Sequence, residues 1–431
     1  MRVLVIGSGG REHALVWALQ RSPSAPEVFA APGNPGIAQT ALCFPIDAAD
    51  PEHVAQLADD LTVDLVVVGP EGPLVAGVAD AVRAHGRACF GPGAAAARLE
   101  GSKAWMKQVL AEAGVPTARH ATFGVDDEAA ALAYLEAFAP PYVVKTDGLA
   151  AGKGVVVTES LADARDAVRA YLSGEAFGDA GRTLVIEEGL TGPELSLLVV
   201  CNGDPDAAIP LAPAQDFKRS LDGDAGPNTG GMGAYSPVPI VSDALVDDVM
   251  ERAVRPTLRW LADHGAEYRG VLYAGMMLTP DGPKVIEYNV RFGDPESQVV
   301  LPRVTSDVAE LLFAAATGDK LAVTFSDEAA VTVVLAADGY PASPRTGDPI
   351  TGLHAAEGVN SVTVFHAGTT RDEQGVLRTA GGRVLSVTAT GVDLEVARTR
   401  AYEAAGIIGW DGVHLRHDIA AQAAAAQRRA G

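Results

Sequence analysis

Short apolar runs alternate with helix-periodic segments over residues 1 to about 100. The apolar runs predict buried strands, and the segments between them, where apolar residues recur every three or four positions, predict helices. The predicted strands are 3–6, 28–30, 65–68 and 88–90, and the predicted helices are 12–21, 51–61 and 74–85. Strands that alternate with helices indicate βαβ units and a parallel sheet. The loops GSGGREH, APGNPG and GPEGP follow strand ends, which is the sheet edge where open α/β folds bind ligands.

The pattern changes twice after residue 100. Gly101-Ser102 precedes a predicted helix at 103–113, and residues 121–190 predict a strand, a helix, a hairpin, a helix and a strand. Residues 191–300 are strand-rich and include a glycine-rich loop at 223–235 and a helix near 243–264. Alternating apolar and polar residues at 331–334 and 384–387, with a helix near 392–405, predict a β-rich C-terminal domain.

The hairpin in residues 143–157, VVKTDGLAAGKGVVV, only partly matches a phosphate-binding P-loop. A P-loop reads G-x-x-x-x-G-K-[ST] and opens a helix. Here Gly148 and Gly152 are one residue too close, and Gly154 stands after Lys153 where the P-loop has a hydroxyl. The flanks are β-branched and aromatic, so the pattern favours a glycine-rich turn between two strands.

Composition argues against several classes of protein. The net charge is 33 − 55 = −22, which argues against a nucleic-acid binder or a protein that binds anionic membranes, but not against a small anionic ligand. No apolar run approaches the roughly 18 residues that span a membrane. Cys43, Cys89 and Cys201 form no CxxC pair, so we expect neither a disulfide framework nor a zinc site, and a reducing cytoplasm fits.

Lysine is scarce, with seven residues against 26 arginines. A lysine at a strand end or in a glycine loop of such a chain is a candidate point charge for phosphate, which is the position of Lys145 and Lys153. We expect Lys107, Lys284 and Lys320 to be ordinary surface lysines.

The N-terminal loop resembles a dinucleotide fingerprint but departs from it. Gly7 and Gly9 fit, whereas Glu12 stands at the sixth position and no acidic residue ends the second strand, so NAD binding is not expected. The loop can still bind one phosphate through backbone N–H groups, with Arg11 adding charge. Glu71 in GPEGP is placed to accept from ribose hydroxyls, although this stretch taken alone favours a solvated turn.

Two further stretches carry candidate chemistry. In VIEEGLTGPELS, Glu187, Glu188 and Glu194 are candidates for an adenine amino group and a ribose, although an acidic strand end taken alone is more often a surface. In VIEYNVRFGDPE, Glu287, Asn289 and Arg291 project from one strand face. The first two offer hard oxygens to Mg²⁺, and Arg291 can neutralise a transferring phosphoryl group; a solvated strand face is the alternative.

Six motifs, taken together and in this order, resemble the phosphoribosylamine–glycine ligase family of ATP-grasp enzymes. They are VIGSGGREHAL, GSKAWMK, KTDGLAAGKGV, AFGDAGRT, GPNTGGMGAYSP and RFGDPE. The resemblance covers essentially the whole chain and implies an α/β ATP-grasp fold. The implied units are an N-terminal open parallel α/β domain (1–102), a first ATP-grasp part with the glycine-rich flap (103–190), a second part with the metal site (191–325) and a β-rich C-terminal domain (326–431). It also implies a cytoplasmic monomer.

The family resemblance implies a two-step ligation. Glycine's carboxylate attacks the γ-phosphate of ATP, giving glycyl phosphate and ADP, and the amine of 5-phosphoribosylamine then displaces phosphate to form glycinamide ribonucleotide for purine biosynthesis. Mg²⁺ or Mn²⁺ is the implied metal. No protein nucleophile is needed, because positioning and charge neutralisation do the work.

The resemblance also implies roles for particular residues. Lys103 and Lys145 would contact the phosphates, with Lys145 and Arg291 acting in catalysis. Gly152, Lys153 and Gly154 would bind ATP from the flap. Glu187, Leu190 and Glu194 would bind its adenosine. Glu287 and Asn289 would hold the metal. Gly9, Gly10, Arg11 and Glu71 are the candidates for phosphoribosylamine, and Arg291 and Asp294 those for glycine.

The chain departs from the usual pattern at two places. Residues 273–277 lack the additional metal-binding carboxylate of many ATP-grasp enzymes, and Phe217 replaces an imidazole in the usual QDHKR stretch. Three other functions stay open at this stage: an ATP-grasp ligase for a different acid or amine, a Rossmann-type oxidoreductase, and a nucleotide sensor without catalysis.

Overall fold

The computed structural model describes residues 1–149, 154–174 and 182–430. Its N-terminal domain is built on a parallel sheet in the order β3-β2-β1-β4-β5, which confirms the predicted βαβ series. The strands are β1 (Arg2–Gly7), β2 (Glu27–Pro32), β3 (Leu42–Cys43), β4 (Leu65–Val68) and β5 (Ala88–Phe90). The helices are α1 (Gly10–Gln20), α2 (Pro51–Asp60), α3 (Glu71–Val75) and α4 (Val78–Ala84), with a 3₁₀ turn at Ile37–Gln39.

The single helix predicted at 74–85 is wrong. The chain forms two helices, α3 and α4, with a break at Gly77. Gly77 has φ = +92°, a left-handed conformation that only glycine adopts at little cost, so it ends one helix and starts the next in a new direction.

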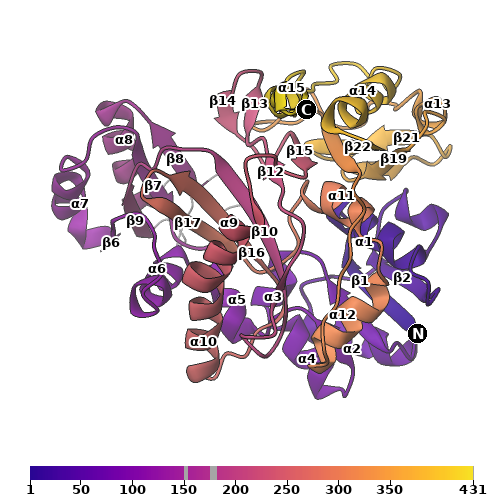
Figure 1. Cartoon of the computed structure of the whole chain (residues 1–431), viewed down its shortest axis with the longest axis horizontal. Coiled ribbons are helices and arrows are strands. Elements are labelled where there is room, and N and C mark those ends of the chain that lie inside the picture. Colours follow the sequence, from indigo (N-terminus) through magenta and orange to yellow (C-terminus); the bar gives the residue numbers. More distant parts are fainter. Residues whose placement is uncertain (150–153, 175–181, 431) are drawn as a thin grey trace.

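The segment that follows forms an outer lobe, at the left in Figure 1. Its antiparallel sheet has the order β6-β9-β7-β8 and carries α7 and α8. α5 (Ala94–Gly101) packs against α3 and leads into the lobe, whose elements are α6 (Lys103–Glu112), β6 (His120–Gly124), a 3₁₀ turn (Val125–Asp127), α7 (Glu128–Leu135), β7 (Tyr142–Thr146), β8 (Val155–Thr158), α8 (Leu161–Leu172) and β9 (Thr183–Glu188). The predicted hairpin is confirmed in its two strands, which pair from Tyr142↔Thr158 to Lys145↔Val155. Ser102 caps α6 as expected, its Oγ accepting from the Trp105 N–H at 3.1 Å.

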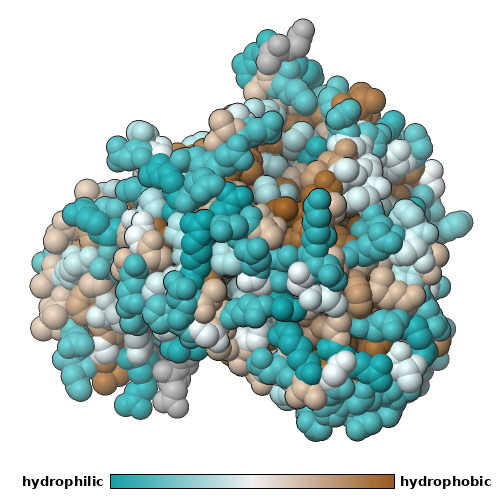
Figure 2. All heavy atoms as spheres, turned by 60° about the horizontal axis from the view of Figure 1, so that its bottom comes forward, coloured by the Kyte–Doolittle hydropathy of each residue, from teal (hydrophilic) through white to brown (hydrophobic). Residues whose placement is uncertain are grey.

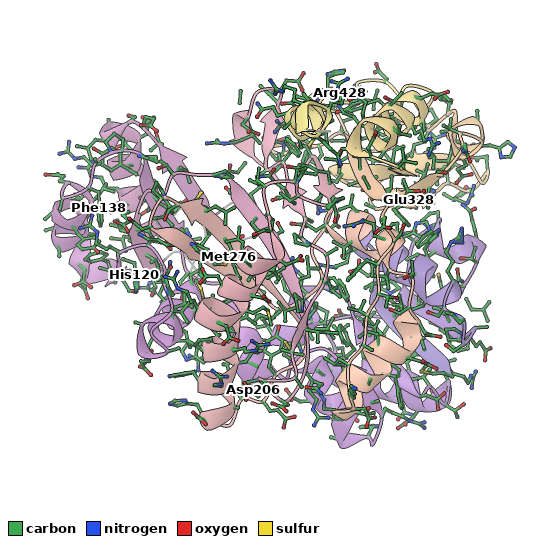
Figure 3. The ribbon with its side chains drawn as sticks, in the orientation of Figure 1. His120, Phe138, Asp206, Met276, Glu328 and Arg428 are labelled. Carbon is green, nitrogen blue, oxygen red and sulfur yellow. The ribbon has the colours of Figure 1, made fainter. Side chains whose placement is uncertain are left out.

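A second antiparallel sheet, in the order β11-β10-β16-β17, lies in the middle of the molecule. Its strands are β10 (Glu194–Asn202), β11 (Ile209–Pro210), β16 (Arg269–Thr279) and β17 (Gly282–Asn289). The helical elements of this part of the chain are α9 (Asp243–Val249), a π-helical turn (Met250–Val254), α10 (Arg255–Asp263), α11 (Ser297–Val300), a 3₁₀ turn (Leu301–Arg303) and α12 (Val308–Thr317), of which α11 packs against α1 and the C-terminal sheet. Met276, on β16, lies in this central part, whereas Phe138 lies in the lobe (Figure 3).

The C-terminal sheet includes two strands that come from much earlier in the sequence. Its order is β12-β15-β18-β22-β19, in which β12 (Gln215–Asp216) and β15 (Gly233–Ser236) flank the glycine-rich loop. The later strands are β18 (Ala329–Ala336), β19 (Val362–His366) and β22 (Arg383–Gly391). Smaller elements are the hairpins β13 (Arg219–Leu221) with β14 (Ala225–Asn228) and β20 (Thr369–Arg371) with β21 (Leu377–Thr379), and helices α13 (Leu353–Glu357), α14 (Leu394–Ala405) and α15 (Ala421–Ala430). The glycine-rich segment is therefore an ordered connection between the central sheet and the C-terminal domain.

One hydrophobic core joins the N-terminal domain to the central sheet. Leu4 and Ile6 of β1 belong to the same buried cluster as Leu195 and Leu197 of β10. Val3 and Val5, on the opposite face of β1, belong to a second buried cluster. Because both faces of the parallel sheet are covered, its strands are continuously apolar, as their sequences predict.

The molecular surface in Figure 2 is mostly hydrophilic, with hydrophobic residues in small scattered groups. Among the described residues, no helix combines the length and the apolar character required to cross a bilayer.

Candidate active site between two sheets

The lobe sheet and the central sheet meet where β7 approaches β17. The Lys145 Nζ donates to the Ile286 carbonyl at 3.3 Å, and the Thr117 hydroxyl donates to the Val285 carbonyl at 2.6 Å. The connection between the sheets is short, since β9 ends at Glu188 and β10 begins at Glu194. Leu190 lies in this connection, so the predicted adenosine-binding residues stand at the hinge between the two sheets.

Strand pairing places the predicted metal ligands on one face of the central sheet. Glu287 is opposite Gly275, and Asn289 is opposite Tyr273. Gly275 is in turn opposite Ser196 on β10. A Cβ added at Gly275 would lie 3.3 Å from the Glu287 Cγ, which is tighter than ordinary van der Waals contact. The missing side chain at Gly275 therefore leaves room for the Glu287 carboxylate.

The Glu287 carboxylate is held in its charged form by the field of nearby lysines. Burial opposes the charge, but Lys218, Lys145 and Lys103 together outweigh burial and lower the pKa of Glu287. Within the described part of the chain, no hydrogen bond or ion pair ends on this carboxylate. The same part contains no group of three or more His, Cys, Asp or Glu side chains suited to a metal. A charged carboxylate beside the Asn289 amide therefore fits a divalent cation that takes most of its ligands from phosphate and water.

The predicted phosphate-binding lysines lie beside the glycine-rich turn. The Lys103 Nζ, in the first turn of α6, donates to the Gly148 carbonyl at 2.9 Å. Burial lowers the pKa of Lys103, and the neighbouring Glu287 opposes that shift. The Gly154 carbonyl accepts from the Thr146 N–H at 2.8 Å and closes the hairpin. Gly152 and Lys153, expected on the flap, lie outside the described residues.

A buried cluster joins Glu187 to two lysines, one of which was expected at the surface. The Lys145 Nζ lies 3.0 Å from Glu187 Oε1, and the Lys107 Nζ lies 3.0 Å from Glu187 Oε2. The prediction that Lys107 is a surface lysine is wrong, since its side chain is 1% exposed. Lys284 is only partly exposed and lies 3.6 Å from Glu188, and Lys320 is exposed as expected.

Lys218 and Asp216 also lie at the site, although neither was predicted there. The Lys218 Nζ lies 2.7 Å from the Glu194 Oε2, so the expected ribose-binding carboxylate is paired with this lysine. Burial and the neighbouring carboxylates raise the pKa of Asp216, against the opposing field of Lys218. Lys218 is one of the seven lysines of the chain, so lysine scarcity was the one sequence signal that pointed to it.

Phe217 points away from the site. Its ring stands over the Arg416 guanidinium, 4.9 Å from the ring centroid, and 6.2 Å from the ring of Tyr235. The Arg416 side chain is 1% exposed and is paired with Asp224 and Asp418. Phe217 therefore packs toward the C-terminal domain, while its two sequence neighbours face the charged groups of the site. The aromatic ring stabilises the buried arginine through a cation–π contact.

Arg291 connects the metal-binding strand to the N-terminal domain. Its Nη2 lies 2.9 Å from Glu100 Oε1 and 3.2 Å from Asn289 Oδ1, and its Nε lies 3.3 Å from Glu71 Oε2. The Arg11 Nη1 lies 3.9 Å from the same Glu71 oxygen. The two arginines thus share Glu71, which brings the predicted phosphoribosylamine residues next to the predicted catalytic arginine.

Glu12 explains why the N-terminal loop is not a dinucleotide site. The Gly9 N–H donates to Glu12 Oε2 at 2.6 Å, and the Arg11 Nε lies 2.5 Å from Glu12 Oε1. A Cβ added at Gly7 or Gly69 would overlap the Glu12 side chain. The carboxylate of this buried residue therefore occupies the helix N-terminus where a dinucleotide fold places the pyrophosphate.

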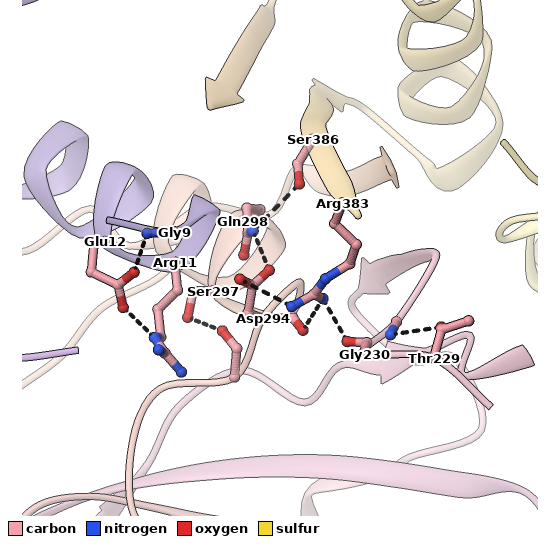
Figure 4. A network of polar contacts seen from close by, with 12 residues as sticks. Gly9, Arg11, Glu12, Thr229, Gly230, Asp294, Ser297, Gln298, Arg383 and Ser386 are labelled. Atoms are coloured by element: carbon pink, nitrogen blue, oxygen red, sulfur yellow. Dashed lines mark hydrogen bonds and ion pairs between the residues drawn. The ribbon is translucent and has the colours of Figure 1, made fainter. Parts of the chain in front are cut away.

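Asp294 lies in a polar network that reaches the C-terminal domain (Figure 4). Arg383, on β22, donates to the Asp294 carbonyl at 2.6 Å and to the Gly230 carbonyl at 2.5 Å. Gln298 Nε2 donates to Asp294 Oδ1 at 2.8 Å, and the Arg383 Nη2 lies 3.3 Å from Asp294 Oδ2. Although burial opposes its charge, Arg383 and Arg11 lower the pKa of the Asp294 carboxyl. The C-terminal domain thus fixes the loop that was predicted to bind glycine.

Comparisons with known proteins identify the family. Three consecutive segments match the phosphoribosylglycinamide synthetase N domain (1–100), its ATP-grasp (A) domain (101–297) and its C domain (330–422). A protein of Streptomyces coelicolor named phosphoribosylamine–glycine ligase is 54% identical over 431 residues, covering 99% of this chain and 100% of the relative.

Solved structures agree with this result. The crystal structure of phosphoribosylamine–glycine ligase from Thermotoga maritima superposes with a TM-score of 0.83 at 34% identity, covering 97% of this chain and 100% of that one. The biotin carboxylase domain of 2-oxoglutarate carboxylase from Hydrogenobacter thermophilus, solved with MgADP, shares the fold with a TM-score of 0.70 at 18% identity, covering 96% and 91% of the two chains.

These matches span the N-terminal sheet, the lobe, the central sheet and the C-terminal sheet in order, and they exclude a Rossmann-type oxidoreductase. The chain therefore belongs to the phosphoribosylamine–glycine ligase family, the glycinamide ribonucleotide synthetases of the ATP-grasp superfamily.

Proposed function

We propose that this site joins glycine to 5-phosphoribosylamine at the expense of ATP, giving glycinamide ribonucleotide, ADP and phosphate in de novo purine biosynthesis. One observation at the site supports this proposal most directly. The Glu287 carboxylate stays charged between two sheets, under the combined field of Lys218, Lys145 and Lys103. A metal-bound triphosphate carries both negative phosphates and a positive ion, and lysines grouped around a charged carboxylate can match both.

In the first step the glycine carboxylate attacks the γ-phosphate, and the bond to the β-phosphate oxygen breaks to release ADP. Lys103 and Lys145 contact the phosphates, and Arg291, held by Glu100 and Glu71, neutralises charge on the transferring group. The hinge residues Glu187, Leu190 and Glu194 hold the adenosine, partly through their backbone groups. These contacts would hold the γ-phosphate of ATP in a fixed orientation for attack by the glycine carboxylate.

In the second step the amine of 5-phosphoribosylamine attacks the acyl carbon of glycyl phosphate. The carbon–nitrogen bond forms, the bond between the acyl carbon and the bridging oxygen breaks, phosphate leaves with that oxygen, and the amine gives up one proton. Gly9, Gly10, Arg11 and Glu71 bind the phosphoribosylamine, and Asp294 binds the glycine ammonium. The shared contact of Arg11 and Arg291 with Glu71 supports this proposal, because it brings together the residues proposed for the two substrates.

ATP-grasp enzymes bind ATP with Mg²⁺, and Glu287 and Asn289 are the residues that would hold the ion here. A bound Mg²⁺ or Mn²⁺ supplies charge neutralisation at the β- and γ-phosphates. Hard oxygen donors fit either ion. Asn289 Oδ1 is oriented by the Arg291 Nη2 at 3.2 Å, so the arginine and the metal ligand form one unit.

The test is an assay of ADP release with ATP, glycine and freshly made 5-phosphoribosylamine. We expect turnover only when all three substrates are present, with one ADP formed for each glycinamide ribonucleotide detected by mass spectrometry. Replacing glycine with alanine or serine, or the amine with ammonia, distinguishes this activity from another ATP-grasp ligation. Binding of ATP without turnover of any acid and amine pair would instead establish a nucleotide sensor. We further propose a monomer that works in the cytoplasm, with monomer mass checked by light scattering.

A further inference from the structure

Lys107 is a fully buried cation for which the reaction as described has no use. It lies on α6, four residues after Lys103, and its side chain is 1% exposed. Its Nζ donates to the Thr117 hydroxyl at 2.7 Å and lies 3.0 Å from Glu187 Oε2. Burying a lysine is costly unless the charge is paired, so the position requires the Glu187 carboxylate.

The same carboxylate faces a second lysine, the one proposed to contact phosphate. Lys145 lies 3.0 Å from Glu187 Oε1, and its side chain is 5% exposed. Glu187 Oε1 nevertheless lacks a properly directed hydrogen bond, and the Lys145 Nζ donates to the Ile286 carbonyl on the central sheet. Two ammonium groups therefore share one carboxylate, and the cluster carries a net charge of about +1 at neutral pH.

We propose that Lys107 is a positioning residue, which neutralises Glu187 so that Lys145 keeps its charge and its free donors for the triphosphate. Without Lys107, Glu187 and Lys145 form a neutral pair, and the ammonium turns toward the carboxylate. The inference rests on the proposed function in one respect, namely that Lys145 contacts the phosphates of ATP.

The protonation of Lys107 offers a way to switch this effect. Charged groups face it from three strands: Glu187 on β9, Lys145 on β7 and Glu287 on β17. Burial lowers the pKa of Lys107 to about 8, against the attraction of Glu187. The ammonium is charged below pH 8 and loses its proton as the pH rises above that value. Raising the pH should therefore reproduce, in the unmodified protein, the loss of the Lys107 charge.

The experiment measures the dissociation constant of a non-hydrolysable ATP analogue with Mg²⁺ by calorimetry. At pH 7.5, Lys107→Met should weaken binding roughly 10- to 100-fold, the range expected when one charged contact is lost. Lys320→Met, at an exposed lysine, is the matched control and should bind as the unmodified protein does.

A double-mutant cycle separates the charge effect from simple packing. In a Glu187→Gln background there is no carboxylate to neutralise, so adding Lys107→Met should change the dissociation constant less than twofold. An unchanged penalty in that background, or no penalty in the single variant, would overturn the proposal. Lys145→Met gives an independent check: if it leaves binding intact, the phosphate role of Lys145 fails, whatever the result at Lys107.

A pH series gives a second measurement that needs no folded Met variant. Binding by the unmodified protein should weaken between pH 7.5 and 9.5, and Lys107→Arg, which stays protonated, should weaken less over the same range. Burial also lowers the pKa of Lys103, but this lysine is present in both proteins and therefore weakens binding at high pH equally in both. Identical pH profiles would contradict the proposal.

Discussion

Replacing Glu287 with glutamine removes one negative charge from the proposed metal site and keeps the side-chain volume. The structure indicates that the fold should tolerate this change, because the carboxylate accepts no hydrogen bond from any described residue. The site would then lose one of the carboxylates that balance Lys218, Lys145 and Lys103, and Asn289 would be the remaining charge-independent ligand on the strand. The variant thus isolates the electrostatic contribution of a single group.

The expected loss is large. A single preorganised group acting on developing charge contributes about 3–4 kcal/mol to the transition state, so kcat should fall by about 10²- to 10³-fold. The assay is ADP release at saturating substrates over a series of Mg²⁺ concentrations. Because the neutral ligand binds the ion more weakly, the Mg²⁺ concentration for half-maximal activity should rise as well.

Asp281→Asn is the matched control, since Asp281 is an exposed carboxylate in the turn between β16 and β17. It should have unaltered kcat and an unaltered Mg²⁺ requirement. Thermal midpoints of both variants close to that of the unmodified protein establish that the fold is intact. A kcat within threefold of the unmodified protein in Glu287→Gln, at equal Mg²⁺, would refute the assignment of Glu287 as a metal ligand.

Three further predictions concern other parts of the molecule. Arg11→Ala should cost about 2–3 kcal/mol in kcat/KM for 5-phosphoribosylamine and leave ATP affinity unchanged, as measured by varying each substrate in turn; equal losses for both would reject the two-site arrangement. Gly275→Ala should push Glu287 out of place and raise the Mg²⁺ requirement with little change in thermal midpoint, and unchanged metal dependence would count against it. Burial lowers the pKa of His366 to about 4, so acidification from about pH 6.5 toward 4 protonates the unfolded chain first and removes up to roughly 3 kcal/mol of stability; His366→Gln should flatten this loss in urea unfolding, and a parallel pH profile would disprove it.

Local sequence patterns predicted the elements whose structure depends on neighbouring residues. The parallel strands of the N-terminal sheet follow from continuous apolar runs, and the hairpin at β7 and β8 follows from β-branched flanks around glycines. The split of the predicted 74–85 helix was missed because Gly77 is tolerated in a helix, and only the conformation it adopts reveals the break.

The parts that sequence did not predict depend on contacts between distant segments. Lys107 is buried because Glu187, 80 residues later, supplies its counter-charge, and nothing near Lys107 in the sequence shows this. The glycine-rich loop is ordered because β12 and β15 join a sheet whose other strands begin at Ala329. Glu12 breaks the glycine pattern of a dinucleotide-binding loop. Only the structure shows that its carboxylate accepts from the Gly9 N–H at the start of α1.

The central claim is that the carboxylate of glycine is activated by phosphorylation. It is tested most directly with glycine labelled with ¹⁸O in both carboxylate oxygens, incubated with ATP, Mg²⁺ and 5-phosphoribosylamine, followed by mass spectrometry of the products. The proposed reaction predicts one ¹⁸O atom in each inorganic phosphate released and one retained in the amide of glycinamide ribonucleotide. Inorganic phosphate without ¹⁸O, or label in AMP, would contradict it.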